Sequence, residues 1–599
     1  MPSFPLVPAR LAFSAGGTPY SEEFGDVYHS AEGGVGQAQH VFLGGNGLPG
    51  RWRGRRAFTI LETGFGLGLN FLATWQAWRA DPQRCERLHF VSIEKHPFRT
   101  LDLDLVYKSI SGIKNEANQL LAQWPALVPG MHRLEFEQGR VVLTVFFADI
   151  AAIREVDLAA DAFYLDGFAP DRNPDMWSPA LMRALGRVAA PGATAATWSV
   201  AAGVRNALER TGFIVEKQKG FGSKREMLSA RAVKGNSRIK PENRTALVIG
   251  AGIAGAAVCE RLCARGWQVT LIERHDRAAA EASGNPAGIF HPVVSPDDSV
   301  FARLTRASFL YSLSRWKRLE NLRWSQCGVV QLPRDEDERR SQERALQALA
   351  FPPEYVSARK EGGLVFPQAG WVSPTSLVSS LLAEGDIEGV FGQEVFSIER
   401  SEERWIAKDK KSTAIASAPV MILANSADAI RLAPQKHMRL RRVRGQLTLV
   451  PAIAGLETVL IRGGFAIPGI DGVSAIGASF DIDDEDPNVR ADSHEGNLAR
   501  LKELIPEFSF NLKTSRIEGR VAFRSVVPDR LPVIGALGEG LYGAFAYGSR
   551  GLLWAGLGGE LLASLMQNEP LPLEKKLVAA LAPNRFALRA ERRARGARA

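Results

Sequence analysis

The sequence predicts an α/β protein in which two units, each built on an open and largely parallel sheet, follow one another along the chain. Three observations support this fold class. The chain has 599 residues, too many for a single hydrophobic core. Two glycine-rich turns, at residues 64–68 and 250–255, each follow a short apolar run and lead into a helix pattern. Acidic residues also stand directly after several apolar runs, where the carboxyl ends of parallel strands would lie.

Composition limits the classes of protein that remain. Hydrophobic residues make up 45% and charged residues 23% of the chain, which is ordinary for a globular protein. The net charge of +9 favours a polyanionic partner, and a generic basic protein is equally compatible with it. The four scattered cysteines are too few for a disulfide framework or a zinc site, so no metal is expected. Without an apolar run of about 18 residues or a signal-peptide pattern after Met1, we expect a soluble, cytoplasmic protein with no membrane partner.

The first unit opens with about 55 residues rich in glycine and proline, in which the segment 20–28 combines acids with aromatic residues. That segment is typical of either a lid over a site or a surface turn. A strand at 57–61 then leads into the first glycine turn, and a helix is expected over 70–78. An acid at the head of the turn suits a ligand with a positively charged amino-acid end, such as S-adenosylmethionine, better than a pyrophosphate. The turn residues assigned to this cofactor are Glu62, Gly64, Gly66 and Gly68.

Three more strands of this unit end at acidic residues. The strands at 88–93, 141–147 and 162–165 are followed by Glu94, Asp149 and Asp166. Each acid alone favours a structural role, but ligands of open α/β sheets bind along the carboxyl edge, so several acids on that edge lead us to expect that they face one site. Glu94 is placed for ribose hydroxyls and Asp149 for an adenine amino group. Asp166 is the candidate for orienting an acceptor amine and receiving its proton.

A strand at 192–198, a helix at 204–210 and a hairpin over 213–227 complete this unit. Two of its segments, 62–72 (ETGFGLGLNFL) and 166–177 (DGFAPDRNPDMW), resemble the methyltransferase half of the bifunctional tRNA 5-methylaminomethyl-2-thiouridine biosynthesis proteins. The resemblance implies a class I Rossmann-like methyltransferase over residues 1–235, with S-adenosylmethionine as its cofactor.

The second unit follows a polar, basic linker at 236–245. A strand at 246–249, a glycine turn, a helix and a strand at 267–272 succeed one another in about 30 residues, which is the full dinucleotide-binding unit. Its glycines allow a tight turn, close approach to a pyrophosphate and close packing of helix on strand; they are Gly250, Gly252 and Gly255. Glu273 ends the second strand and is placed to hold ribose hydroxyls. An ordinary tight turn is the alternative.

Later segments resemble the glycine oxidase and D-amino-acid oxidase superfamily. The small residues Ser283 and Gly284 match its flavin-contact segment, and the turn that faces its flavin ring is matched by Gly548, Ser549, Arg550 and Gly551. Arg524 falls at the place of the arginine that clamps a substrate carboxylate; Arg520 is the weaker candidate, and a structural ion pair is the alternative. The resemblance implies a two-lobed FAD-dependent oxidoreductase over 246–575, with a Rossmann FAD-binding subdomain and a mixed-sheet substrate subdomain.

Together the two resemblances imply both final steps on the wobble uridine of certain tRNAs. The oxidase would remove a carboxymethyl group as glyoxylate, and the methyltransferase would then methylate the amine that remains. A fused small-molecule oxidase and methyltransferase, and a binding protein with decayed sites, are the alternatives. tRNA is the expected partner and a monomer is favoured. The basic end of the chain, 576–599, is compatible with a helix, a nucleic-acid contact or a disordered tail.

Overall fold

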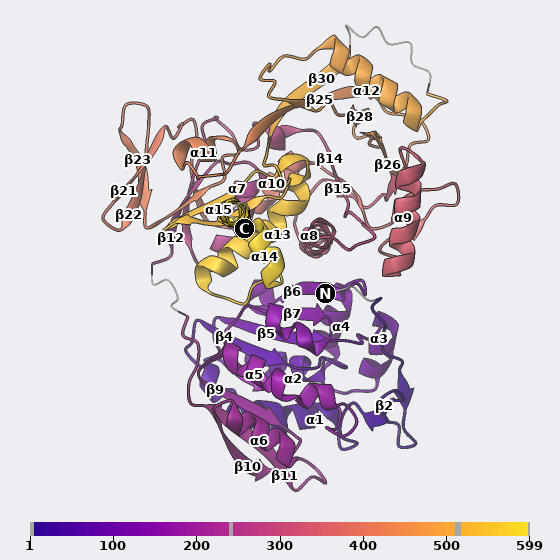
Figure 1. Cartoon of the computed structure of the whole chain (residues 1–599), viewed down its shortest axis with the longest axis vertical. Coiled ribbons are helices and arrows are strands. Elements are labelled where there is room, and N and C mark those ends of the chain that lie inside the picture. The colour runs from indigo at the N-terminus through magenta and orange to yellow at the C-terminus, as the bar shows by residue number, and fades with distance from the viewer. Residues whose placement is uncertain (1–4, 239–242, 509–516, 597–599) are drawn as a thin grey trace. The chain divides into compact units, whose positions relative to one another are not determined.

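The computed structural model describes residues 5–238, 243–508 and 517–596 (Figure 1). By its internal contacts the chain forms two compact units, Phe4–Lys240 with Gln567–Lys575, and Pro241–Met566 with Lys576–Ala599. The segment 567–575, expected in the oxidoreductase half, therefore belongs to the first unit. There the Leu571 N–H donates to the Asp157 carbonyl at 3.1 Å, and Arg133 donates to the Pro570 carbonyl at 2.6 Å. The expected linker at 236–245 includes residues 239–242, which lie outside the described residues.

The first unit is built on an eight-stranded sheet in the order β10-β11-β9-β8-β4-β5-β7-β6. Its strands are β4 (Ala57–Glu62), β5 (Arg87–Glu94), β6 (Gly130–Phe136), β7 (Val141–Phe147), β8 (Ala160–Tyr164), β9 (Ala189–Thr197), β10 (Phe213–Lys219) and β11 (Glu226–Ala232). The central strands run parallel, and β6 and β11 run antiparallel to their neighbours. This confirms the predicted open sheet, with β6 as an additional edge strand.

Apolar side chains on the two faces of this sheet form separate cores. Phe58 and Ile60 pack with α2 (Leu69–Ala80), α3 (Thr100–Lys108) and α4 (Lys114–Gln123). Leu61 packs instead with α5 (Pro179–Val188) and α6 (Ala202–Arg210). Successive residues of a strand point to opposite faces, so a strand covered on both sides is apolar throughout. Shorter elements precede the sheet: β1 (Ala12–Phe13), β2 (Pro19–Ser21), β3 (Asp26–Val27) and α1 (Gly34–Gln37).

The second unit contains the predicted dinucleotide-binding sheet, in the order β20-β13-β12-β24-β32-β31. Its strands are β12 (Thr245–Ile249), β13 (Gln268–Ile272), β20 (Ile387–Val390), β24 (Val420–Leu423), β31 (Val533–Gly538) and β32 (Leu541–Phe545). Only the edge strand β31 runs antiparallel to its neighbour. The helix α7 (Ile253–Cys263) follows the glycine turn, and α10 (Pro374–Ala383) packs against it.

A second, nine-stranded sheet forms the other lobe of this unit, as the mixed-sheet prediction requires. Its strands are β16 (Val329–Gln331), β17 (Ser357–Ala358), β18 (Leu364–Phe366), β25 (Arg441–Pro451), β26 (Val459–Arg462), β27 (Gly464–Ala466), β28 (Val473–Gly477), β29 (Asp481–Ile482) and β30 (Glu518–Val526). Most neighbours are antiparallel, and β16 runs parallel to β26. The lobe also carries α9 (Glu336–Leu349) and α12 (Ala491–Leu504), whereas α8 (Val300–Trp316) contacts α7 through Arg261 with Tyr311 at 3.3 Å and Glu260 with Arg315.

Smaller elements complete the second unit. They are β14 (Gly288–Phe290), β15 (Trp324–Ser325), β19 (Gly370–Val372), β21 (Ser397–Ser401), β22 (Arg404–Lys408), β23 (Ala414–Ala418), α11 (Asp428–Leu432), α13 (Gly551–Gln567), α14 (Lys575–Leu581) and α15 (Arg585–Gly596). The basic end is therefore helical up to residue 596, and Arg585 anchors it through an ion pair of 3.0 Å with Asp529. No helix within the described residues is long and apolar enough to cross a bilayer.

Candidate active sites

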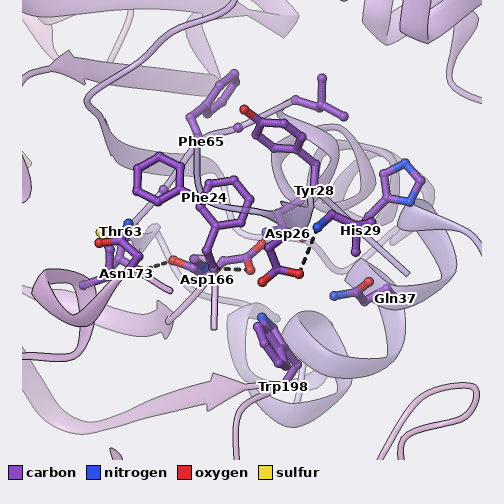
Figure 2. Close-up of a pocket in the computed structure, with 18 of the residues that line it drawn as sticks. Phe24, Asp26, Tyr28, His29, Gln37, Thr63, Phe65, Asp166, Asn173 and Trp198 are labelled. Atoms are coloured by element: carbon purple, nitrogen blue, oxygen red, sulfur yellow. Dashed lines mark hydrogen bonds between the residues drawn. The ribbon is translucent and has the colours of Figure 1, made fainter. Parts of the chain in front are cut away.

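The first unit holds a cavity of about 500 Å³ at the carboxyl ends of its central strands. The first glycine turn, the strand ends of β5, β7 and β8, and the early segment 23–37 all contribute to its lining. Figure 2 shows Phe24, Asp26 and Tyr28 of that early segment beside Asp166. The segment 20–28 is thus part of the site wall and not only a surface turn.

The acid that ends β5 holds the glycine turn in place. Glu94 accepts the Gly66 N–H at 2.7 Å with one carboxylate oxygen and the His96 N–H at 2.7 Å with the other. Gly66 has φ +50°, a conformation that side chains disfavour. Glu94, Gly64 and Gly66 line the cavity, whereas Gly68 lies behind Phe65 at the start of α2.

Glu62 does not reach the cavity. Its carboxyl is fully buried, where it accepts from Asn70 Nδ2 at 2.9 Å and from Ser92 Oγ at 2.7 Å. Burial raises its pKa well above the ordinary value, which favours the neutral acid. The structure therefore places Glu62 beneath the lining residues and not in direct reach of a ligand, because the strand ends with this side chain pointing into the interior.

Asp166 lines the cavity and lies among Phe24, Asp26 and Trp198 (Figure 2). One carboxylate oxygen accepts from Asn70 Nδ2 at 2.8 Å, and the other accepts the Gly167 N–H at 2.9 Å. Burial raises the pKa of Asp166 to about 6, while hydrogen bonds from Asn70, Gly167 and Trp198 oppose that rise. A carboxylate with this pKa can accept a proton near neutral pH.

Two lining residues that the sequence did not single out matter here. The Asn70 amide donates to both Glu62 and Asp166, so it links the acid beneath the cavity to the acid that lines it. Asn70 belongs to the segment 62–72, and the periodicity of the expected helix, which places it on the side facing the sheet, could have identified it. Trp198 follows β9 directly, at the same sheet edge as the acids.

Asp149 also lines the cavity, at the end of β7. It accepts the Ala151 N–H at 3.0 Å and lies 3.3 Å from Lys95 Nζ. The oxygen near Lys95 is Oδ2, the one that the Ala151 N–H does not use, and Lys95 lines the cavity as well. The acids Glu94, Asp149 and Asp166 are thus brought to one cavity, as their positions after parallel strands predict.

The second unit holds a larger cavity, of about 640 Å³, between its two sheets. Gly250 and Gly252 line it at the turn after β12. Gly250 has φ +103°, and a Cβ there would lie 2.9 Å from the Ala424 carbonyl. A Cβ on Gly255 would lie 1.9 Å from the Gly250 carbonyl, so this glycine serves helix packing and does not line the cavity.

Glu273 ends β13 and repeats the arrangement of Glu94. Its carboxylate accepts the Ala251 N–H at 2.7 Å and the His275 N–H at 3.0 Å. Ser283 lines the same cavity, and its hydroxyl accepts the Ile253 N–H at 3.0 Å in the first turn of α7. The small residues at this turn leave the room that a dinucleotide needs, so the fold fits FAD here.

Arg520 and Gly284 lie against each other, and neither lines the cavity. Arg520 donates to the Asn285 side chain at 3.1 Å and to the carbonyl oxygens of Ala280 and Glu281 at 3.0 and 2.7 Å. A Cβ on Gly284 would lie 2.4 Å from the Arg520 guanidinium. Arg520 therefore braces the loop 280–285 and is not available for a substrate, and Gly284 makes space for it instead of facing a ligand.

Arg524 lies in β30, and its side chain lines the second cavity. Burial lowers its pKa, and the charge of Asp481 opposes that change. Among the described residues its guanidinium makes no ion pair or hydrogen bond, so the structural ion pair considered from the sequence is not found. A Cβ on Gly445 in the neighbouring strand β25 would lie 2.2 Å from Arg524 Nη2, which shows why a glycine stands there. A buried, unpaired guanidinium suits an anionic ligand.

The late turn Gly548, Ser549, Arg550 and Gly551 lines the same cavity. Burial lowers the pKa of Arg550, whose guanidinium lies 5.6 Å from the centre of the Phe301 ring. Burial and the Arg550 charge lower the pKa of His291 to about 3, so this histidine is neutral at physiological pH. No group of three or more potential metal ligands occurs in the described part of the chain.

Comparisons with known proteins agree with both halves. A model of the FAD dependent oxidoreductase family matches residues 245–565, and one of S-adenosyl-L-methionine-dependent methyltransferases matches residues 111–233. The tRNA 5-methylaminomethyl-2-thiouridine biosynthesis bifunctional protein MnmC of Paraburkholderia phytofirmans is 48% identical, over 98% of this chain and 99% of that protein. Its namesake from Paraburkholderia xenovorans is 47% identical over the same shares. L-proline dehydrogenase from P. horikoshii shares the fold of the second unit, with TM-score 0.50 at 17% identity, over 58% of this chain and 98% of that one.

Proposed function

The chain belongs to the family of bifunctional tRNA 5-methylaminomethyl-2-thiouridine biosynthesis proteins, and from that membership we propose which of its residues carry the two steps of wobble-uridine modification. It is a bifunctional enzyme with FAD and S-adenosylmethionine as cofactors. The observation that carries the function is the similarity over nearly the whole chain, which places both activities in one polypeptide.

The second cavity is the proposed site of oxidation. Arg524 binds the carboxylate of the carboxymethylaminomethyl group in two parallel hydrogen bonds, because its buried guanidinium has no partner among the described residues. FAD, when bound, supplies the hydride acceptor. Gly250, Gly252, Glu273 and Ser283 hold its dinucleotide part, and the turn 548–551 lies toward its ring. Water then hydrolyses the carbon–nitrogen double bond that hydride loss leaves in the substrate, and the products are the aminomethyl base and glyoxylate.

The first cavity is the proposed site of methylation. S-adenosylmethionine, when bound, supplies the methyl group. Gly64, Gly66 and Glu94 hold it at the turn, with Asp149 at the far end of its nucleoside part. Asp166 orients the neutral amine and takes its proton as the new carbon–nitrogen bond forms, because Asn70 and the Gly167 N–H hold its carboxylate in the cavity lining.

The finer assignments rest on the same reasoning. tRNA is the partner, in keeping with the net charge of +9, and we expect a cytoplasmic monomer. We place the methyltransferase at 1–235, the linker at 236–245, the oxidoreductase at 246–575 and the basic end at 576–599, with 567–575 packed in the first unit.

The test uses tRNA that carries the carboxymethylaminomethyl wobble base. The purified protein is incubated with it, with and without S-adenosylmethionine, and the tRNA is digested for nucleoside mass analysis. We expect the aminomethyl nucleoside without the methyl donor and the methylaminomethyl nucleoside with it. Unchanged tRNA from a yellow, flavin-loaded protein would contradict the tRNA assignment and favour a small-molecule oxidase.

A further inference from the structure

The aromatic side chains that line the first cavity differ in whether their ring faces are free. Six such residues line it: Phe24, Tyr28, Phe65, Phe168, Trp198 and Phe221. Phe24 stacks on Phe168 with ring centres 4.7 Å apart, and Phe65 stacks on Trp124 at 5.3 Å. Tyr28 packs edge-on against Phe98 and Phe168. Each of these four rings therefore already contacts another ring of the protein, and Phe221 lies beside the ring of His40.

Trp198 has a different neighbour. Its ring is covered by the Lys224 ammonium, which lies 3.6 Å from the ring centre. Lys224 is an exposed residue at the tip of the β10–β11 hairpin, and its side chain has no ion pair among the described residues. Partial burial over the ring lowers the pKa of Lys224, and Asp26 opposes that change. A lysine side chain from an exposed hairpin tip therefore covers this face of the indole.

The chemistry of the substrate sets where its base must lie. The amine that is methylated is two covalent bonds from the C5 atom of the uracil ring. When the amine is at Asp166, the ring must therefore lie beside that carboxylate. Trp198 is the aromatic residue whose side chain lies close enough to the Asp166 carboxyl to lower its pKa. In Figure 2 it lies on one side of Asp166, while Phe24 and Tyr28 lie on the other.

We propose that Trp198 is the platform on which the base of the wobble uridine stacks during methylation, and that Lys224 covers this platform until the base displaces it. The proposal rests on the function given above and assigns a nucleobase subsite within the same cavity. A base that undergoes chemistry has to leave its own stack, and stacking on an aromatic side chain offsets part of that cost. Trp198 provides such a surface beside the reacting amine.

The test measures methylation of tRNA that carries the aminomethyl wobble base, at saturating S-adenosylmethionine. Loss of one base-stacking contact by alanine substitution corresponds to about 5- to 150-fold in affinity. We expect Trp198→Ala to lower kcat/KM by that factor, chiefly through KM, and Trp198→Phe, which keeps a ring face, to recover most of the loss. Lys219→Ala, in the same hairpin but outside the cavity lining, is the matched control and should leave KM unchanged.

The variant Lys224→Ala tests whether Lys224 covers the Trp198 ring or binds the tRNA itself. Removing a cation–π contact at an exposed site corresponds to about two- to fivefold. We expect Lys224→Ala to lower KM by that factor in the wild-type background and to have no effect on KM beside Trp198→Ala. A rise in KM in Lys224→Ala would overturn the cover, because it would mean that the lysine binds the tRNA itself.

Three controls separate the outcomes. S-adenosylmethionine affinity, measured by calorimetry, reports whether each variant keeps a folded first unit. If Trp198→Ala methylates as well as the wild type while Phe168→Ala does not, the platform is Phe168 and the proposal is wrong. If the wild-type protein itself leaves aminomethyl tRNA unmethylated, the proposed function fails before the subsite is tested.

Discussion

The glycine turns of the first and second cavities are held by the same arrangement of hydrogen bonds. In each, the acid that ends the second strand accepts two backbone N–H groups, one from the turn and one from two residues beyond itself. The distances are 2.7 and 2.7 Å for Glu94, and 2.7 and 3.0 Å for Glu273. In both cavities these hydrogen bonds from the protein's own carboxylate hold the backbone of the turn.

The side chains around this shared device differ in charge. Among the described residues, seven carboxylates and two lysines line the first cavity, whereas seven arginines and five carboxylates line the second. A carboxylate-rich wall attracts a cationic ligand such as a sulfonium and an acceptor amine, and it repels phosphates. An arginine-rich wall has the opposite preference and suits a pyrophosphate and a carboxylate substrate. The backbone makes a nucleotide site, and the flanking charges select its ligand.

The largest expected effect comes from removing the Asp166 carboxylate of the first cavity. Asp166→Ala should lower kcat/KM for methylation by about 10²- to 10⁴-fold, the usual contribution of general acid–base catalysis, and leave oxidation unchanged. Nucleoside mass analysis would then show the aminomethyl base accumulating in the presence of S-adenosylmethionine. Asp175→Ala, which removes an exposed carboxylate that lines the same cavity, is the matched control. Loss of oxidation in Asp166→Ala would mean that the two cavities do not act independently.

The converse change removes the unpaired arginine of the second cavity. Arg524→Met keeps the length of the side chain but leaves the substrate carboxylate without its partner, which costs about 2–5 kcal/mol, or about 30- to 5,000-fold in kcat/KM for oxidation. Methylation of aminomethyl tRNA should be unaffected. Arg334→Met serves as the control, because Arg334 lines the same cavity but already pairs with Glu338 at 2.9 Å. Equal losses in the two variants would argue for a general charge effect over a specific clamp.

The two cavities should also respond differently to pH. Burial raises the pKa of Asp166 to about 6, so its carboxyl becomes protonated, and unable to accept a proton, as the pH falls through that value. Both reactions need a neutral substrate amine and share that dependence. The ratio of kcat/KM for methylation to that for oxidation should therefore fall about tenfold per pH unit below 6. A ratio that stays constant between pH 5 and 7 would remove Asp166 as the proton acceptor.

Much of the architecture could be predicted because the parallel strands are apolar runs. β7 (Val141–Phe147) has the bounds that its sequence indicates, and α2 contains the expected helix 70–78. The edge strand β6 was missed because its sequence, GMHRLEF, mixes charged and apolar residues without a regular period. The placement of 567–575 was missed for another reason: contacts such as that of Arg133 with the Pro570 carbonyl join residues far apart in the chain and leave no local pattern.

The site residues that could be predicted from the sequence are mainly those that stand at the ends of parallel strands. Glu94, Asp149 and Asp166 all face the first cavity, and Glu273 and Arg524 the second. Position in the chain does not say how deep a side chain lies, however. Gly68, Gly255 and Gly284 serve packing, and Glu62 lies under the site. Burial of that kind depends on three-dimensional neighbours such as Asn70 and Ser92, which the turn motif does not specify.

The smallest expected effect comes from a substitution that tests whether Glu62 lies beneath the cavity or contacts the cofactor. Glu62→Gln keeps the oxygen that accepts from Asn70 and places an amide beside Ser92, whose hydroxyl can accept as well as donate. Because burial favours the neutral acid, the substitution removes little charge, and we expect S-adenosylmethionine affinity and methylation to stay within about threefold of wild type. Glu62→Ala should instead lower the free energy of unfolding of the first unit by about 2–5 kcal/mol, since it leaves a void and unpaired polar groups. Calorimetric titration and thermal unfolding measure the two quantities. A loss of affinity above about tenfold in Glu62→Gln would instead mean that this carboxylate contacts the cofactor directly, as the glycine turn alone suggests. Glu62 would then be one of the negative charges that distinguish the first cavity from the second.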